Sequence, residues 1–160
     1  MSNRANALAD RLELGARALA NFASELTDAE WQTRVPKDGR KVGVIVHHIA
    51  TVYPIEIELA QAVAASNSVV DMTWDVIHQM NAGHAMENDT VAKEETLQLL
   101  QRNSAAAATA IRALSDEQLD QAAPVSLYSD ATLTCQFMLE DHAVRHSYHH
   151  LARIREALKS

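Results

Sequence analysis

Three histidines have the spacing to hold one divalent metal ion. His146 and His150 are four residues apart in a stretch with helical apolar periodicity, and this spacing stacks two imidazole rings on one face of a helix. His48 lies in a second histidine-bearing segment, VGVIVHHIATV, which long-range packing could bring to the pair. Three protein ligands leave coordination positions open for water or substrate. The pattern therefore predicts a reactive metal site rather than a closed structural one.

Polar residues close to this trio are candidates for supporting roles. His142 is one helical turn before His146, and it is a candidate fourth ligand, an outer hydrogen-bond partner or a general base in the pocket. We favour a position in the pocket or a hydrogen bond to one of the metal ligands, and we take His142 as the candidate catalytic base. Glu56, Glu140 and Asp141 are acids that could accept a hydrogen bond from a ligand histidine; each also fits a solvated position on a helix.

Arg153 follows His150 by three residues, near the same helical face. Its planar guanidinium could bind a substrate carboxylate through two parallel hydrogen bonds. A salt bridge to a neighbouring helix is an equally good interpretation. Cys135 is the single cysteine of the chain, and nothing near it in sequence marks it for activation, so we expect a packed thiol.

The composition predicts an all-α protein of one domain, residues 1–160. Hydrophobic residues make up 48% of the chain, with 4 Gly and 3 Pro, and this balance favours helix nearly throughout. Apolar periodicity and capping signals predict helices over about residues 4–26, 40–66, 74–86, 91–114 and 132–158. The third and fourth could also form one bent helix. Pro54 should kink or break the second, and a polar loop should follow Pro124 to about Ser129.

An internal echo suggests how these helices pair. LTDAEW at 26–31 and LSDEQL at 114–119 each follow a long helix and precede a Pro-containing loop and a histidine-bearing helix. Two such helical hairpins would bring the second and last long helices together across an approximate two-fold axis. Four long helices of this kind imply a bundle, and bundle cores commonly hold metal ions between facing helices.

The charge and the termini limit the partners. A formal net charge of −7 and a pI of about 5.5 argue against nucleic acid, whose binding depends on clustered Lys and Arg. The amphipathic N-terminal segment lacks the continuous apolar core of a signal peptide. We also expect no stretch to reach the roughly 20 apolar residues that a membrane span needs. We therefore expect a cytoplasmic protein that acts on a small molecule, with no membrane partner.

The segments KVGVIVHHIA and HAVRHSYHHLARI at 142–154, together with LTDAEW, resemble those of the DinB-like, or YfiT-like, metalloprotein family. The resemblance covers nearly the whole chain. It implies a four-helix bundle and places His48, His146 and His150 at the three metal-binding positions. The family's metal is typically nickel or zinc, with water completing the shell, and the likeness also implies a homodimer. Leu151, Ala152 and Arg153 replace a frequent Arg-Gly-Gln run.

The middle segment WDVIHQMNAGHA, at 74–85, is similar to the branch that includes mycothiol-dependent maleylpyruvate isomerase. This likeness suggests Asn81 and His84 as substrate-side residues and a low-molecular-weight thiol as cofactor; a partly exposed structural role for His84 fits as well. Our leading hypothesis is a metal-dependent thiol S-transferase, isomerase or hydrolase. The alternative is a non-catalytic metal-binding or stress-response helical module. A di-iron carboxylate bundle ranks lower because the chain lacks the paired Glu-x-x-His motifs.

Overall fold

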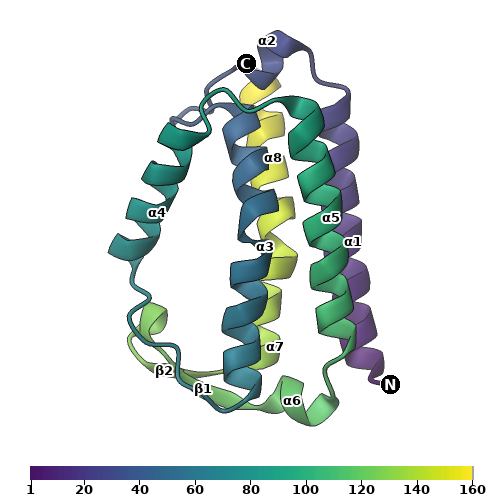
Figure 1. Cartoon of the computed structure of the whole chain (residues 1–160), viewed down its shortest axis with the longest axis vertical. Helices are drawn as coiled ribbons and strands as arrows, with labels where there is room; N and C mark the ends of the chain where they lie inside the picture. Colours follow the sequence, from purple (N-terminus) through teal and green to yellow (C-terminus); the bar gives the residue numbers. More distant parts are fainter. Residues whose placement is uncertain (160) are drawn as a thin grey trace.

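Four long helical segments form a bundle in the computed structural model, which describes residues 1–159. They are α1 (Asn3–Ser24), α3 (Val42–Ala64), α5 (Lys93–Arg112) and a last segment that joins α7 (Cys135–Met138), the π-helical η2 (Leu139–Val144) and α8 (Arg145–Lys159) (Figure 1). The predicted all-α four-helix bundle is confirmed.

Capping boxes begin the two short helices that follow α1 and α5. Thr27 opens α2 (Asp28–Trp31) and Ser115 opens α6 (Asp116–Asp120), each with a reciprocal capping box to the residue three positions later. In both boxes the cap side chain and the N3 side chain satisfy amide groups that the first helical turn leaves free. The echo in the sequence therefore corresponds to two equivalent connections at opposite ends of the bundle (Figure 1).

The helices pack in a ring whose order differs from their order in the chain. Extensive contacts join α1 to α5, α5 to α3, and the last segment to both α3 and α1. Within each hairpin, α1 with α3 and α5 with the last segment, the two helices run antiparallel and lie diagonally across the ring, whereas α3 and α5 run parallel as direct neighbours (Figure 1). This arrangement brings the second and last long segments side by side, as the two-fold echo suggests. The buried stripe of α1 includes Leu8, Leu12 and Leu19.

Pro54 does not break α3, which continues from Val42 to Ala64. By length and composition this helix could also cross a membrane, contrary to the expectation from the sequence. However, 61% of its most apolar window is buried inside the bundle. The core helix of a bundle passes the same test, because it is surrounded by apolar side chains on most sides.

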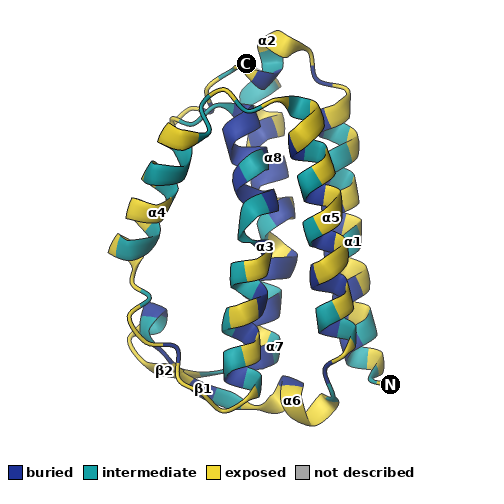
Figure 2. Cartoon of the chain, in the orientation of Figure 1, coloured by how far each residue is buried: buried dark blue, intermediate teal, exposed yellow. Residues whose placement is uncertain are grey.

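The segment after α3 forms a separate helix that stands apart from the bundle. None of the residues of α4 (Trp74–Glu87) is buried, and Asn88–Ala92 separates it from α5. Figure 2 shows exposed and half-buried residues along the whole of α4, whereas the N-terminal half of α3 beside it is deeply buried. The alternative of one bent helix is therefore wrong, and α4 instead forms one wall beside the bundle (Figure 1).

A small β-hairpin replaces the predicted polar loop. Strand β1 (Ala122–Val125) pairs antiparallel with β2 (Ala131–Thr134), and the 3₁₀ turn η1 (Ser126–Tyr128) lies between them. The amide of Val69 donates to the oxygen of Pro124 and that of Ser126 donates to the oxygen of Val69, each over 2.9 Å. These pairings join residues distant in sequence, so local patterns did not reveal them. The last helical segment begins at Cys135, later than predicted, because Thr134 caps it.

Candidate metal centre

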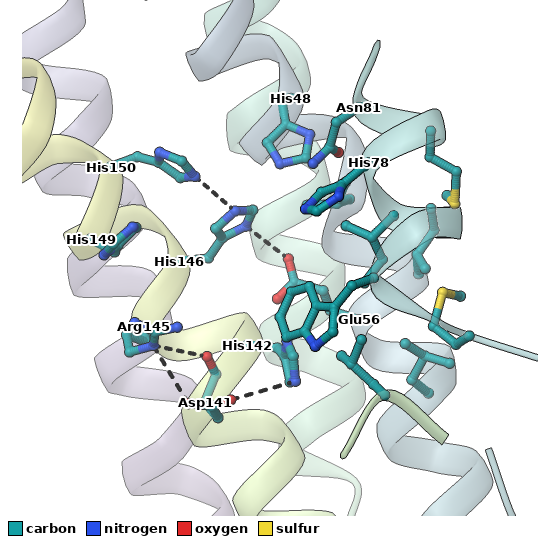
Figure 3. A pocket seen from close by; sticks show the side chains of 18 of the residues that line it. His48, Glu56, His78, Asn81, Asp141, His142, Arg145, His146, His149 and His150 are labelled. Carbon is teal, nitrogen blue, oxygen red and sulfur yellow. Dashed lines mark hydrogen bonds and ion pairs between the residues drawn. The ribbon is translucent and has the colours of Figure 1, made fainter. Parts of the chain in front are cut away.

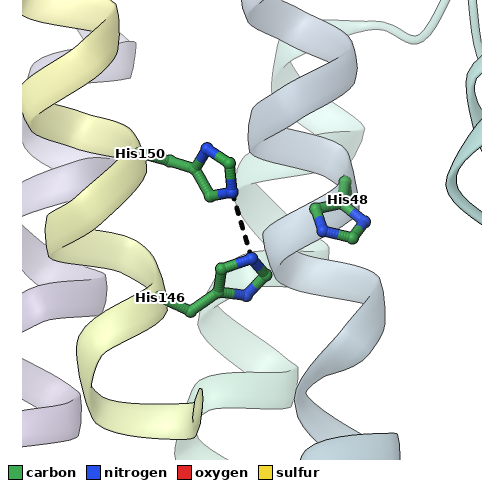
Figure 4. Close-up of side chains that lie close together, drawn as sticks. All are labelled: His48, His146 and His150. Carbon is green, nitrogen blue, oxygen red and sulfur yellow. Dashed lines mark hydrogen bonds between the residues drawn. The ribbon is translucent and has the colours of Figure 1, made fainter. Parts of the chain in front are cut away.

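The three predicted ligands meet between α3 and α8. One ligand atom of each of His48, His146 and His150 lies within 4.8 Å of the others. The ring centroids of His146 and His150 are 4.8 Å apart, and that of His48 is 5.0 Å from His146 and 6.0 Å from His150. Figure 4 shows His146 and His150 extending from α8 toward α3, which carries His48. The i, i+4 spacing and the packing of two helices produce this group together.

Glu56 sets the tautomer of His146. Nδ1 of His146 is 3.1 Å from Oε1 of Glu56, and a carboxylate can only accept, so Nδ1 carries the hydrogen. The lone pair of His146 therefore sits on Nε2, which is 3.1 Å from Nε2 of His150. A carboxylate that holds a ligand histidine in this way is the usual partner of a metal-bound imidazole.

Burial keeps the other two histidines neutral. His48 and His150 are 5% and 7% exposed. Burial, reinforced by the neighbouring His146 and by Arg40, lowers the pKa of His48 to about 2 and that of His150 to about 3. Both rings therefore keep a lone pair across the physiological pH range. A metal ion requires neutral imidazole, so the electrostatics suit a ligand role.

The spacing of His146 and His150 fits a divalent metal ion held by nitrogen. Two imidazole nitrogens bound at about 2.0–2.1 Å to one tetrahedral Zn²⁺ lie roughly 3.3 Å apart, close to the 3.1 Å between the Nε2 atoms of His146 and His150. Oε2 of Glu56 is buried and, within residues 1–159, has no hydrogen-bond partner. Glu56 lines the cavity beside the histidines. Its unsatisfied oxygen can accept a hydrogen bond from a molecule bound there.

Arg40 is a feature of this site that the sequence patterns did not identify. Its Nε and Nη2 donate to the two oxygens of Asp38 over 2.7 and 2.9 Å, and both side chains are largely buried. Burial raises the pKa of Asp38, but the hydrogen bonds and charge of Arg40 outweigh it and lower the pKa overall. The pair comes from the loop before α3 and lines the same cavity as His48 and His150.

A cavity of about 490 Å³ adjoins the three histidines. In Figure 3, α4 contributes one wall with His78 and Asn81, and the last helical segment contributes the opposite wall. Apolar side chains from α3, α4 and their linker line much of it; they are Val52, Ile55, Leu59, Met72, Trp74, Ile77 and Met80. Besides the triad and Leu127, polar side chains line the rest; they are Asp38, Arg40, Glu56, His78, Asn81, Tyr128, Asp141, His142, Arg145, His149 and Arg153. The cavity suits a small molecule with apolar and polar parts.

The other predicted residues divide into two groups. Asn81, His142 and Arg153 line the cavity. His84 does not line it and lies against the histidines of α3 instead. Nε2 of His84 is 2.8 Å from Nδ1 of His47, and its ring meets that of His48 edge-on. Burial lowers the pKa of His84 to about 4. This pair joins α4 to α3, a contact that two residues 37 positions apart do not reveal in sequence.

Cys135 is buried at the first turn of α7. Burial raises the pKa of its thiol to about 11. The thiolate is the reactive form of cysteine, so this thiol is a packing group and not a nucleophile.

His142 has a partner that the sequence did not suggest. It belongs to η2, where π-helical turns interrupt the α-helical spacing between His142 and His146. Its Nε2 is 3.2 Å from the hydroxyl of Tyr128, which comes from the hairpin. The same hydroxyl is 2.5 Å from Oδ2 of Asp141. Isolated π-helical turns within α-helices occur frequently at functional sites.

Comparison with known families agrees with this arrangement. The DinB superfamily matches residues 11–154, which include the whole histidine group. The chain belongs to the DinB superfamily. No curated protein matches this DinB protein in sequence.

Solved structures share the DinB fold with this chain. YfiT from Bacillus subtilis, described as a probable metal-dependent hydrolase with an unusual four-helix bundle topology, matches with a TM-score of 0.78 and 20% identity over 99% of this chain and 89% of its own. The mycothiol-dependent maleylpyruvate isomerase matches with a TM-score of 0.71 and 14% identity over 96% of this chain. This chain spans only 63% of the isomerase. A DinB family member from Exiguobacterium sibiricum matches with a TM-score of 0.58 and 18% identity, over 99% of this chain and 92% of its own.

Proposed function

We propose that this protein is a metal-dependent enzyme in which His48, His146 and His150 bind one divalent metal ion, with zinc or nickel preferred. The observation that carries the proposal is the convergence of three imidazoles at the edge of a cavity large enough for a small molecule. A purely structural site would be closed by a fourth protein ligand. Within residues 1–159, these three residues form the cluster of metal-ligating side chains whose ligand atoms lie close enough together to share one ion.

The residues around the site have distinct roles in this proposal. A bound divalent ion lowers the pKa of a water or thiol ligand and so supplies a nucleophile near neutral pH. Glu56 orients His146 through Nδ1. His142 accepts a proton from the reacting group, and Arg153 holds an anionic part of the substrate at the cavity wall. The apolar residues of α3 and α4 bind the remaining part of the substrate and exclude water.

A low-molecular-weight thiol is the proposed co-substrate, and transfer or isomerisation on a small molecule is the proposed reaction. The support is the common fold with the mycothiol-dependent isomerase and the cavity beside the histidines. Hydrolysis is the variant in which water takes the place of the thiol, and its support is the likeness to YfiT.

Metal content tests the site directly. Protein purified without an affinity tag and incubated with Zn²⁺ or Ni²⁺ should contain about one metal ion per chain by elemental analysis. His146→Ala should lose this metal while its helical circular-dichroism spectrum is unchanged. His78→Ala is the matched control, because His78 is an exposed histidine outside the group. A fully metallated His146→Ala variant, or a wild-type protein that binds no metal, would contradict the proposal.

Turnover separates an enzyme from a metal-storage module. Metal-free and metal-loaded protein should be compared with glutathione, bacillithiol and mycothiol against electrophilic acceptors, and with activated esters in the absence of thiol. The proposal expects metal-dependent turnover in one of these sets. Metal binding without turnover in any of them would favour the non-catalytic module.

A further inference from the structure

The hydroxyl of Tyr128 connects two side chains of η2. It is 2.5 Å from Oδ2 of Asp141 and 3.2 Å from Nε2 of His142, whereas Nε2 of His142 is 3.6 Å from Oδ2 of Asp141. His142 therefore reaches the carboxylate through the phenol and not directly. Figure 3 shows Asp141 and His142 on the same wall of the cavity as His146, with Arg145 beside Asp141.

The hydrogens in this trio can be assigned from donor and acceptor capacity. A carboxylate only accepts, and a phenol has one hydrogen to donate, so the short contact requires Tyr128 to donate to Asp141. The phenol oxygen then has only lone pairs to offer His142. Nε2 of His142 must carry the hydrogen that fills the 3.2 Å contact, and Nδ1 of the neutral ring must carry the free lone pair.

The surroundings of Tyr128 and Asp141 favour this direction. A cation lies beside Asp141: Nε of Arg145 is 3.6 Å from Oδ1 of Asp141 and also donates to the main-chain oxygen of Asp141 over 3.1 Å. Burial and the hydrogen bond to Asp141 raise the pKa of Tyr128, so the phenol keeps its hydrogen. Within residues 1–159, Nδ1 of His142 forms no hydrogen bond, and His142 lines the cavity.

The hairpin holds Tyr128 in this position. The ring of Tyr128 meets the indole of Trp74 edge-on, with 6.4 Å between the centroids, and the phenyl ring of Phe137 edge-on, with 6.0 Å between the centroids. Trp74 starts α4 and Phe137 lies in α7, so three elements fix the phenol. A residue whose ring is in contact with two other rings loses little additional freedom when it forms the two hydrogen bonds.

We propose that Tyr128 is a positioning residue that locks His142 in the tautomer with hydrogen on Nε2, so that Nδ1, which has no hydrogen-bond partner within residues 1–159, is the proton acceptor. When Nδ1 takes a proton from a thiol or water, the ring becomes an imidazolium whose Nε2 hydrogen remains bonded to Tyr128. The negative charge of Asp141, relayed through the phenol, stabilises this cation. The catalytic part of this inference rests on the proposed function; the tautomer does not.

The tautomer can be measured without any substrate. Zinc-loaded protein with ¹⁵N-labelled histidine should be recorded at pH 8 in long-range ¹H–¹⁵N spectra, which distinguish protonated from unprotonated ring nitrogens. For wild-type His142 we expect an unprotonated Nδ1 and a protonated Nε2. In Tyr128→Phe the ring loses its acceptor, so the two ¹⁵N shifts should move toward each other as the second tautomer becomes populated. His142→Gln identifies the signals.

Tyr148→Phe is the matched control. It removes the same hydroxyl from an exposed tyrosine of α8, whose Oη donates to the main-chain oxygen of Arg11 over 3.4 Å, and the His142 signals should not change. A wild-type His142 with hydrogen on Nδ1, or a Tyr128→Phe variant with unchanged His142 signals, would overturn the positioning role.

Metal content and turnover separate this inference from the proposed function. Tyr128→Phe should retain about one zinc per chain, and any thiol-dependent or hydrolytic turnover should fall in kcat by roughly 10-fold or more, with KM nearly unchanged, since general-base catalysis contributes about 10²–10⁴-fold. If the tautomer responds as expected and no turnover is found with any substrate set, the proposed function fails and the positioning of His142 stands. If turnover exists but is the same in Tyr128→Phe, the catalytic part of the inference fails and the metal site stands.

Discussion

The side-chain amide of Asn103 donates a hydrogen bond over 2.8 Å to the main-chain oxygen of Ala50. In an α-helix this oxygen would accept from the residue four positions later, which is Pro54, and proline has no amide hydrogen. Asn103 of α5 therefore satisfies the carbonyl that Pro54 leaves free in the buried helix α3. The bonded carbonyl lies two residues after His48, and the bond stabilises the helix that carries this histidine.

Replacing Asn103 with Ala should destabilise the fold by about 1–2 kcal/mol, because it leaves a buried carbonyl without a donor. In a Pro54→Ala background the helix regains its own donor, so the same replacement should cost clearly less. Urea unfolding of the four proteins in this double-mutant cycle measures the coupling. Arg102→Ala, an exposed neighbour, should change stability by at most about 0.5 kcal/mol. Strictly additive effects of the two replacements would contradict the assignment.

Glu56→Gln should weaken metal binding about 10- to 100-fold, because the neutral amide makes His146 a weaker ligand than the carboxylate does. Competition with a chromophoric zinc chelator measures the affinity. Glu58→Gln changes the same group two residues away on the exposed side of α3, and it should bind zinc as the wild type does. Equal affinity of Glu56→Gln and the wild type would show that the contact to His146 does not support the metal.

Gly43 and Gly83 should respond to alanine in opposite ways. A Cβ at Gly43 would overlap the indole of Trp31, which is 4% exposed and donates from Nε1 to the oxygen of Val91 over 3.0 Å. Gly43→Ala should therefore cost about 1–3 kcal/mol through overpacking. Apart from its chain neighbours and the backbone of its own helix, no atom of residues 1–159 lies within 4 Å of a Cβ at Gly83 in α4, so Gly83→Ala should stabilise by up to about 1 kcal/mol through helix propensity. Thermal unfolding of both variants checks the signs, and a stable Gly43→Ala would contradict the close contact.

The sequence predicted those parts of the site that depend on helical periodicity. The spacing of His146 and His150 places them on one face of any helix, and the paired capping boxes at Thr27 and Ser115 mark equivalent connections. The meeting with His48 was predicted from the internal echo and from the resemblance to the family, because helical periodicity cannot select the helix that packs against α8. The comparisons and the fold confirm that resemblance.

Residues from loops and from the hairpin were not predictable in the same way. Tyr128 reaches His142 through a turn whose register depends on the pairing of β1 with β2 and on Val69. Arg40 is buried because Asp38 neutralises it, and ion pairs between neighbouring loop residues have no periodic signal. The expected placement of His142 on one stripe with His146 assumed α-helical spacing, which the π-helical turns of η2 interrupt.

The contact of Glu13 in α1 with Arg112 in α5 predicts how one part of the stability depends on pH. Nη1 and Nη2 of Arg112 donate to Glu13 over 3.2 and 2.7 Å, and these hydrogen bonds lower the pKa of Glu13. A carboxyl whose pKa is lower in the folded state stabilises the fold above its unfolded pKa of about 4.3. That contribution decreases as the pH falls through the folded pKa, because protonation removes the charge.

Glu13→Gln should therefore be less stable than the wild type at pH 7, and the difference in unfolding free energy should shrink as the pH falls from 5 to 3. Urea unfolding across this range, at low and at about 0.5 M salt, measures it; the salt should reduce the difference at pH 7, because the pair is partly exposed and is screened. Glu25→Gln, at the exposed end of α1, is the control and should show a much smaller dependence. A difference that is the same at pH 7 and pH 3 would mean that Glu13 contributes through packing of its side chain and not through its charge.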